Sequence, residues 1–298
     1  MSRLLKIGIL YGIMMIILEN GFYLFGWISP ELLANFDQFI MILIPAVLLA
    51  LITRTDLKER FKLKGFKPST LLYIFALFLA LLPISGFLSG LTTYLVGVNP
   101  NGVDAYIDAM ETSLFMKWFL IAITPAICEE IMFRGLLLDK RIGLNMHVLA
   151  LMSGLMFSLF HVGYDQLLYT FPLGLVFAYV SIISGSIFPA MIMHLMNNSL
   201  GIFAEVIGSG VEEVAVEEAI SLGSLLPLFI AACFGIIVIV LVLKRMIKSY
   251  KYDDKLRLAK NGKDAALYRK EKKILTFMPQ VIVLIYVWMM NAFLLMGA

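Results

Sequence analysis

Residues 222–243 read LGSLLPLFIAACFGIIVIVLVL, a run of 22 residues without a charged side chain. A helix needs about 20 apolar residues to cross a hydrocarbon core roughly 30 Å thick, so this run predicts a transmembrane helix. The whole chain has a similar character: of its 298 residues, 61% are hydrophobic and 15% are charged, and the mean hydropathy is +0.91. Soluble domains are about 25% charged, so this composition excludes a water-soluble protein.

The same length criterion predicts nine spans along the chain. They are residues 4–26, 37–54, 69–98, 116–138, 146–164, 168–186, 187–207, 222–243 and 274–297. We therefore expect an all-α fold, a polytopic transmembrane helical bundle of about eight to nine spans.

The positions of the basic residues predict the orientation of this bundle. If nine helices alternate, 22 of the 24 Lys and Arg residues lie in segments on one side of the membrane. The opposite segments, 27–36, 99–115 and 208–221, contain none. By the positive-inside rule we expect the N-terminus and a basic loop over 244–273 in the cytoplasm, and the C-terminus outside. The net charge of +3 is small and does not indicate nucleic acid binding.

The fourth predicted span contains the sequence PAICEEIMFRG at residues 125–135. Glu130 and Arg134 are four residues apart, so they share a helix face and can form an internal ion pair that lowers the cost of burying either. Glu129 points about 100° away from that face, so this spacing makes it available for chemistry. Cys128 has no base at i+3 or i+4 on its own helix, which favours a small core residue over a thiol nucleophile.

Two further spans carry polar pairs at helical spacing, Phe157 with His161 and His194 with Asn198. Ionisable residues inside a membrane span are costly and are functional candidates by default. Singly, each has a structural interpretation, such as a histidine bonded to a backbone carbonyl or an asparagine joining two helices. Their joint occurrence, one pair per helix and in this order, points to a shared site.

The three patterns EExxxR, FxxxH and HxxxN together resemble the CPBP family of intramembrane proteases, also called the CAAX-processing and bacteriocin-processing or Abi family. This family includes the Ras-converting CAAX endopeptidases. The resemblance covers roughly residues 115–205. The family positions are filled by Glu129, Glu130, Arg134, Phe157, His161, His194 and Asn198.

By this resemblance, Glu129 and His161 would hold and deprotonate a water molecule, and His194 and Asn198 would form an oxyanion hole. Glu130, Arg134 and Phe157 would support them. No cofactor is implied, although Glu129, His161 and His194 also form the ligand set of a catalytic zinc site. With the predicted boundaries, Glu129 and His161 differ in depth by roughly 10 Å at 1.5 Å per residue.

The resemblance implies an intramembrane endopeptidase that acts on a membrane-anchored or lipidated substrate, either a prenylated CAAX-type protein or a bacteriocin or pheromone precursor. We expect N-terminal helices over 1–114, a catalytic core over 115–207 and C-terminal helices over 208–298. A non-catalytic membrane protein remains the alternative, either an immunity or scaffolding protein or a small-solute transporter with a buried Glu/His relay. A transporter would favour internal repeats with broken helices, and the sequence shows no such self-similarity.

Overall fold

The computed structural model describes residues 36, 38–52, 56–97, 110, 112–138, 145–161, 163–208 and 221–252. Within these ranges every regular element is a helix, which confirms the predicted all-α class for this part of the chain. With π-helical segments labelled η, the elements are η1 (Gln38–Leu43), α4 (Ile44–Ile52), α5 (Leu57–Arg60), α6 (Thr70–Val96), α8 (Leu114–Trp118), η2 (Phe119–Ile123), α9 (Thr124–Glu130), η3 (Ile131–Leu137), α10 (Met146–Phe160), α11 (Tyr164–Ser184), α12 (Phe188–Gly208) and α13 (Leu222–Tyr250).

Seven of the nine predicted spans coincide with helices, and the other two, 4–26 and 274–297, lie outside the described residues. One boundary is wrong, because α13 continues through Tyr250 and takes up the first seven residues of the predicted loop 244–273. Lysine and arginine are good helix formers, and their long side chains let the last turns of a membrane helix reach polar surroundings without ending the helix.

Three helices in the described part of the chain, α6, α11 and α13, are long and apolar enough to cross a membrane. The exposed fractions of Phe234, Ile237 and Leu241 on α13 are 66%, 55% and 60%. A soluble protein rarely exposes such a continuous apolar surface, whereas lipid covers it at no cost. The chain is therefore a multi-pass membrane protein.

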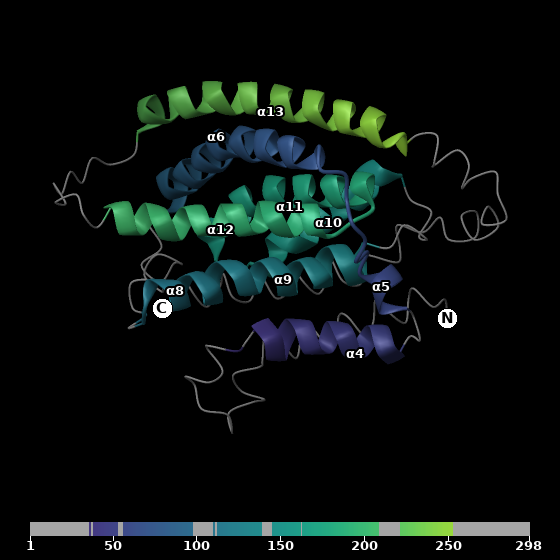
Figure 1. Ribbon diagram of the computed structural model, residues 1–298. Coiled ribbons are helices and arrows are strands. Elements are labelled where there is room, and N and C mark those ends of the chain that lie inside the picture. The colour runs from purple at the N-terminus through teal and green to yellow at the C-terminus, as the bar shows by residue number, and fades with distance from the viewer. Residues whose placement is uncertain are drawn as a thin grey trace.

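The long helices lie side by side in successive layers (Figure 1). The helix α13 packs on α6, and α6 packs on α11 and α12. Further into the bundle, α11 packs on α10, α12 packs on α9, and η1 packs on α9. The three helices that carry the sequence patterns, α9 with η3, α10 and α12, therefore lie in the middle layers.

A tight turn joins α11 to α12, as the near-absence of a linker between the sixth and seventh predicted spans requires. Gly185 has a φ of 72°, in the left-handed region that glycine enters without steric cost. Its N–H donates to the carbonyl of Ser181 and closes α11, and α12 begins at Phe188. The turn sets α12 antiparallel to α11.

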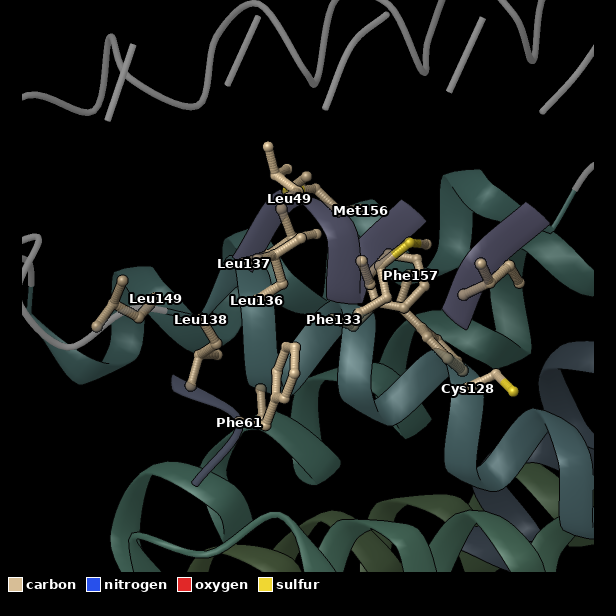
Figure 2. Packing of buried hydrophobic residues seen from close by; sticks show 14 of the residues in the cluster. Leu49, Phe61, Cys128, Phe133, Leu136, Leu137, Leu138, Leu149, Met156 and Phe157 are labelled. Carbon is tan, nitrogen blue, oxygen red and sulfur yellow. The ribbon is translucent and has the colours of Figure 1, made fainter. Parts of the chain in front are cut away.

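Two apolar clusters fill the space between the helices. The first surrounds Phe133 and Phe157, whose rings meet edge to face with centroids 5.4 Å apart, and includes Cys128 and Leu49 (Figure 2). The second is built from α6, α11, α12 and α13 around Phe177. Because α11 contributes to both clusters, the polar residues between Phe157 and Phe177 lie where the two clusters meet.

A short segment after α5 holds the ends of two helices together. Lys62 is buried, and its Nζ donates to the carbonyls of Arg134 and Leu138 at the end of η3. The carbonyl of Lys62 accepts from the N–H of Ile187, just before α12. Lys62 has a φ of 53°, so its backbone adopts a conformation that L-residues rarely enter. The segment thus connects the helix that carries EExxxR to the helix that carries HxxxN.

We expect Lys62→Met to lower the stability of the folded protein by about 2 kcal/mol, because two helix-terminal carbonyls lose a charged donor while the apolar stem is kept. Thermal unfolding of the purified protein in detergent would show this as a fall of several degrees in Tm. The matched control is Lys64→Met, since the side chain of Lys64 is exposed. Equal Tm values for the two variants would contradict the capping role.

Candidate functional site

The helix that carries EExxxR is a continuous helical run from α8 to η3, and two parts of it are π-helical. At the start of α9, the hydroxyl of Thr124 donates to the carbonyl of Phe119, and at the end of η3 the N–H of Leu138 donates to the carbonyl of Phe133. Both bonds span five residues. The widened turns lie on either side of Glu129 and Glu130, and such turns are frequent at functional sites.

The predicted pair of Glu130 and Arg134 is present and fully buried. Its Nη1–Oε1 distance is 2.6 Å, and neither side chain has any exposed surface. The second guanidinium nitrogen, Nη2, donates to the carbonyl of Gly174 at 3.0 Å. The guanidinium carbon also lies 4.4 Å from the centre of the Phe157 ring and 5.4 Å from that of Phe177. Carboxylate, carbonyl and ring faces together replace the water that a buried cation loses.

Gly174 is the residue on α11 that permits this arrangement. A Cβ at this position would lie 2.8 Å from Cδ1 of Phe157 and 3.1 Å from Cα of Gly154. Any larger residue would push α10 away from α11. The glycine therefore brings Phe157 and a backbone carbonyl to the Arg134 guanidinium at the same point.

His194 lies between the two carboxylates. Its Nδ1 is 3.0 Å from Oε1 of Glu130, and its Nε2 is 4.0 Å from Oε2 of Glu129. The sequence predicted Glu130 as structural support paired with Arg134, and Glu129 about 100° away from it on the helix. The two nitrogens of one imidazole point in different directions and can meet carboxylates that lie 100° apart on a helix.

His161 ends α10 and has a non-helical backbone, with φ −79° and ψ 105°. Its Nδ1 lies 2.8 Å from the carbonyl oxygen of Phe157, and its ring centre is 4.8 Å from that of Phe157. The His194 ring packs on the same Phe157 ring at 5.6 Å. Phe157 therefore packs against both imidazoles.

Asn198 contacts the backbone that Pro125 modifies. In an α-helix the carbonyl of Ile121 would accept from the nitrogen of residue 125, but proline has no N–H. The Nδ2 of Asn198 donates to that carbonyl at 3.0 Å. One residue further along α12, the Ser199 hydroxyl accepts from the indole N–H of Trp118 at 2.7 Å. These two bonds attach α12 to the start of the EExxxR helix.

The sequence did not identify Gly174, Phe177, Trp118 or Ser199 as part of the site. Glycine, aromatic and serine residues are common in membrane helices, so their residue types alone give no signal. Small residues are common where membrane helices pack closely, and this is the one feature that could have indicated Gly174.

The zinc alternative requires three ligands around one point. Among the described residues, no group of three or more His, Cys, Asp or Glu side chains is arranged so that it could hold a metal ion. The geometry therefore does not fit a zinc site made from Glu129, His161 and His194.

Two carboxylates, two imidazoles and an amide, gathered inside a helical membrane protein, are the groups that an intramembrane hydrolase requires. The model of the family described as type II CAAX prenyl endopeptidase Rce1-like matches residues 111–200. This segment contains all the motif residues, so over residues 111–200 the match confirms the resemblance seen in the sequence. No curated protein and no solved structure matches the chain.

We expect Arg134→Met to destabilise the protein by about 3–5 kcal/mol, because it leaves the buried carboxylate of Glu130 without its cation. The double variant Glu130→Leu/Arg134→Met should be more stable than the single one, since it removes both charges. Thermal unfolding in detergent gives the Tm of each variant and so shows which of the two is more stable. A double variant that unfolds at a lower temperature than Arg134→Met would contradict the assignment of an ion pair.

The bond between Asn198 and the Ile121 carbonyl predicts an energetic coupling between Asn198 and Pro125. Asn198→Ala should cost about 1 kcal/mol in the wild-type background, and clearly less when Pro125→Ala supplies a backbone N–H for the same carbonyl. A double-mutant cycle of unfolding free energies in detergent measures the difference. If the changes in unfolding free energy of the two substitutions are strictly additive, the hydrogen bond of Asn198 does not depend on Pro125.

Proposed function

We propose that this protein is an endopeptidase that hydrolyses a peptide bond near the C-terminus of a membrane-associated, prenylated protein or peptide. The observation that carries the proposal is the buried cluster in which His194 lies between Glu129 and Glu130, within the segment that matches the family. The family's description supplies the prenylated class of substrate.

Glu129 acts as the general base in this proposal, together with His161. Glu129 takes a proton from a water molecule whose oxygen attacks the scissile carbonyl carbon, and the carbonyl oxygen becomes the oxyanion. When the carbon–nitrogen bond breaks, the same proton passes from Glu129 to the departing amine. Phe157 contacts the imidazoles of both His161 and His194, and this supports a common site for His161 and Glu129.

His194 and Asn198 stabilise the oxyanion. Glu130, ionised beside Arg134, can only accept hydrogen bonds, so Nδ1 of His194 carries a hydrogen. Nε2 donates to an oxyanion only when the ring carries a second proton. Asn198 uses one hydrogen of Nδ2 for Ile121, and its other amide hydrogen is the one available to substrate.

Glu130, Arg134 and Phe157 act as positioning residues. Glu130 holds one side of the His194 ring while Arg134 holds Glu130, and the Phe157 ring packs against both Arg134 and His194. This chain of contacts fixes the direction of Nε2 toward Glu129, so the ion pair determines the geometry of the groups that react.

For this function we propose a bundle of eight to nine transmembrane spans. The catalytic core over 115–207 lies between N-terminal helices over 1–114 and C-terminal helices over 208–298. The N-terminus and the basic region that follows α13 are cytoplasmic, and the C-terminus is outside. The distribution of 22 of the 24 Lys and Arg residues supports this orientation.

We expect Glu129→Gln to reduce cleavage of a farnesylated CAAX peptide in detergent by at least about a hundredfold, because the amide cannot accept the proton. Glu59→Gln is the matched control, since Glu59 is exposed on α5. Cys128→Ala should retain activity, and a strong chelator should leave the wild type unaffected.

Unchanged Tm values and retained peptide binding would show that Glu129→Gln is folded. Substantial cleavage by that folded variant would overturn the role of Glu129. Loss of wild-type activity with chelator would instead require a metal. A folded wild type that cleaves neither farnesylated nor unmodified precursor peptides would favour the immunity, scaffolding or transport alternative.

A further inference from the structure

A cavity of about 690 Å³ lies between the first turn of α10 and the C-terminal turns of α13, away from the residues of the candidate site. Three lysines line it, Lys244, Lys248 and Lys251, together with His147 and Tyr252. Among the described residues that line this cavity, none is acidic. A hollow whose described lining carries several cationic side chains favours an anionic occupant.

The lysines come from one face of one helix. Their spacing of four and then three residues places successive side chains on neighbouring turns. Like charges at this spacing repel one another, and an anion between them removes that cost. Lys251 directly follows the last residue of α13 and has a φ of 49°, in the left-handed region.

The opposite wall is held in place by hydrogen bonds. Nδ1 of His147 lies 2.7 Å from the hydroxyl of Tyr179, and Asn145 caps the helix through the N–H of His147. When Tyr179 donates to Nδ1, Nε2 of His147 carries the hydrogen and is a donor. The start of α10 adds the positive end of a helix dipole to the same wall.

The sequence of α13 leads us to expect the cavity near the lipid headgroups. The uncharged run 222–243 of α13 ends directly before Lys244, and α13 is one of the helices long and apolar enough to cross a membrane. Lysines at the end of such a helix extend toward the headgroup region. Met146 and Ile247 give the cavity an apolar part as well, which suits the first carbons of an acyl chain but is unnecessary for a free ion.

We propose that this cavity binds the phosphate group of an anionic phospholipid, and that Lys244, Lys248 and His147 supply the donors. The proposal is independent of the proteolytic function. A lipid bound here would join the end of α13 to the start of α10 and so tie the outer layer of helices to the motif-bearing ones.

The test uses the full-length protein in detergent with added lipid. We expect phosphatidylglycerol to raise the Tm of the wild type and phosphatidylcholine to leave it unchanged. The variant Lys244→Gln/Lys248→Gln should bind phosphatidylglycerol at least tenfold more weakly, as measured by titrating the Tm shift and by native mass spectrometry of bound lipid.

The matched control is Lys64→Gln/Arg245→Gln, which removes the same charge from exposed positions that do not line the cavity. It should bind like the wild type. If the first variant is poorly folded, Lys251→Gln gives a second test with an expected weakening in the same direction. Equal weakening in the control, or no lipid-dependent shift in the wild type, would overturn the proposal. An equal shift with inorganic phosphate alone would overturn the lipid as the source of the phosphate.

Discussion

The guanidinium of Arg134 is a full positive charge with no exposed surface, and the arrangement of the central helices follows from the need to compensate it. A membrane interior offers no water to do so, and the partners must come from the protein. Glu130 supplies the counter-charge from the same helix, Gly174 supplies a carbonyl from α11, and Phe157 supplies a ring face from α10. These three elements cannot move apart without exposing the charge to hydrocarbon, which makes Arg134 the centre around which they pack.

The carboxylate that compensates the charge of Arg134 also contacts a residue that is proposed to react. Oε1 of Glu130 contacts both Arg134 and Nδ1 of His194, so the carboxylate links a structural cation to an imidazole on α12. Nε2 of that ring then lies toward Glu129. A site in which the base and the oxyanion donors sit on different helices needs such a connection, because small shifts between helices would otherwise change the reacting distances.

The sequence predicted the contacts that arise within one helix and missed most of those between helices. The pairing of Glu130 with Arg134 follows from a spacing of four residues, and the helix positions follow from apolar length. The carbonyl partners of Arg134, Asn198 and Lys62 are backbone atoms of residues 40, 77 and 72 or more positions away, and no residue type marks a carbonyl as the acceptor. The predicted end of α13 at residue 243 is wrong because lysine and arginine continue a helix well, so the first charged residue after an apolar run does not mark the end of the helix.

Pro125 shows how a local break can become a tertiary contact. A proline inside a helix leaves one backbone carbonyl without its α-helical donor, and the structure places an amide of α12 on that carbonyl. The π-helical turns before and after α9 are stabilised in the same way by groups of the protein, as Thr124 and Lys62 illustrate. Irregular backbone is tolerated at membrane depth only where it is buried in protein, so these departures lie in the middle layers of the bundle. The helix beside Glu129 can therefore be irregular, because Asn198 of α12 and Lys62 donate hydrogen bonds to its carbonyls.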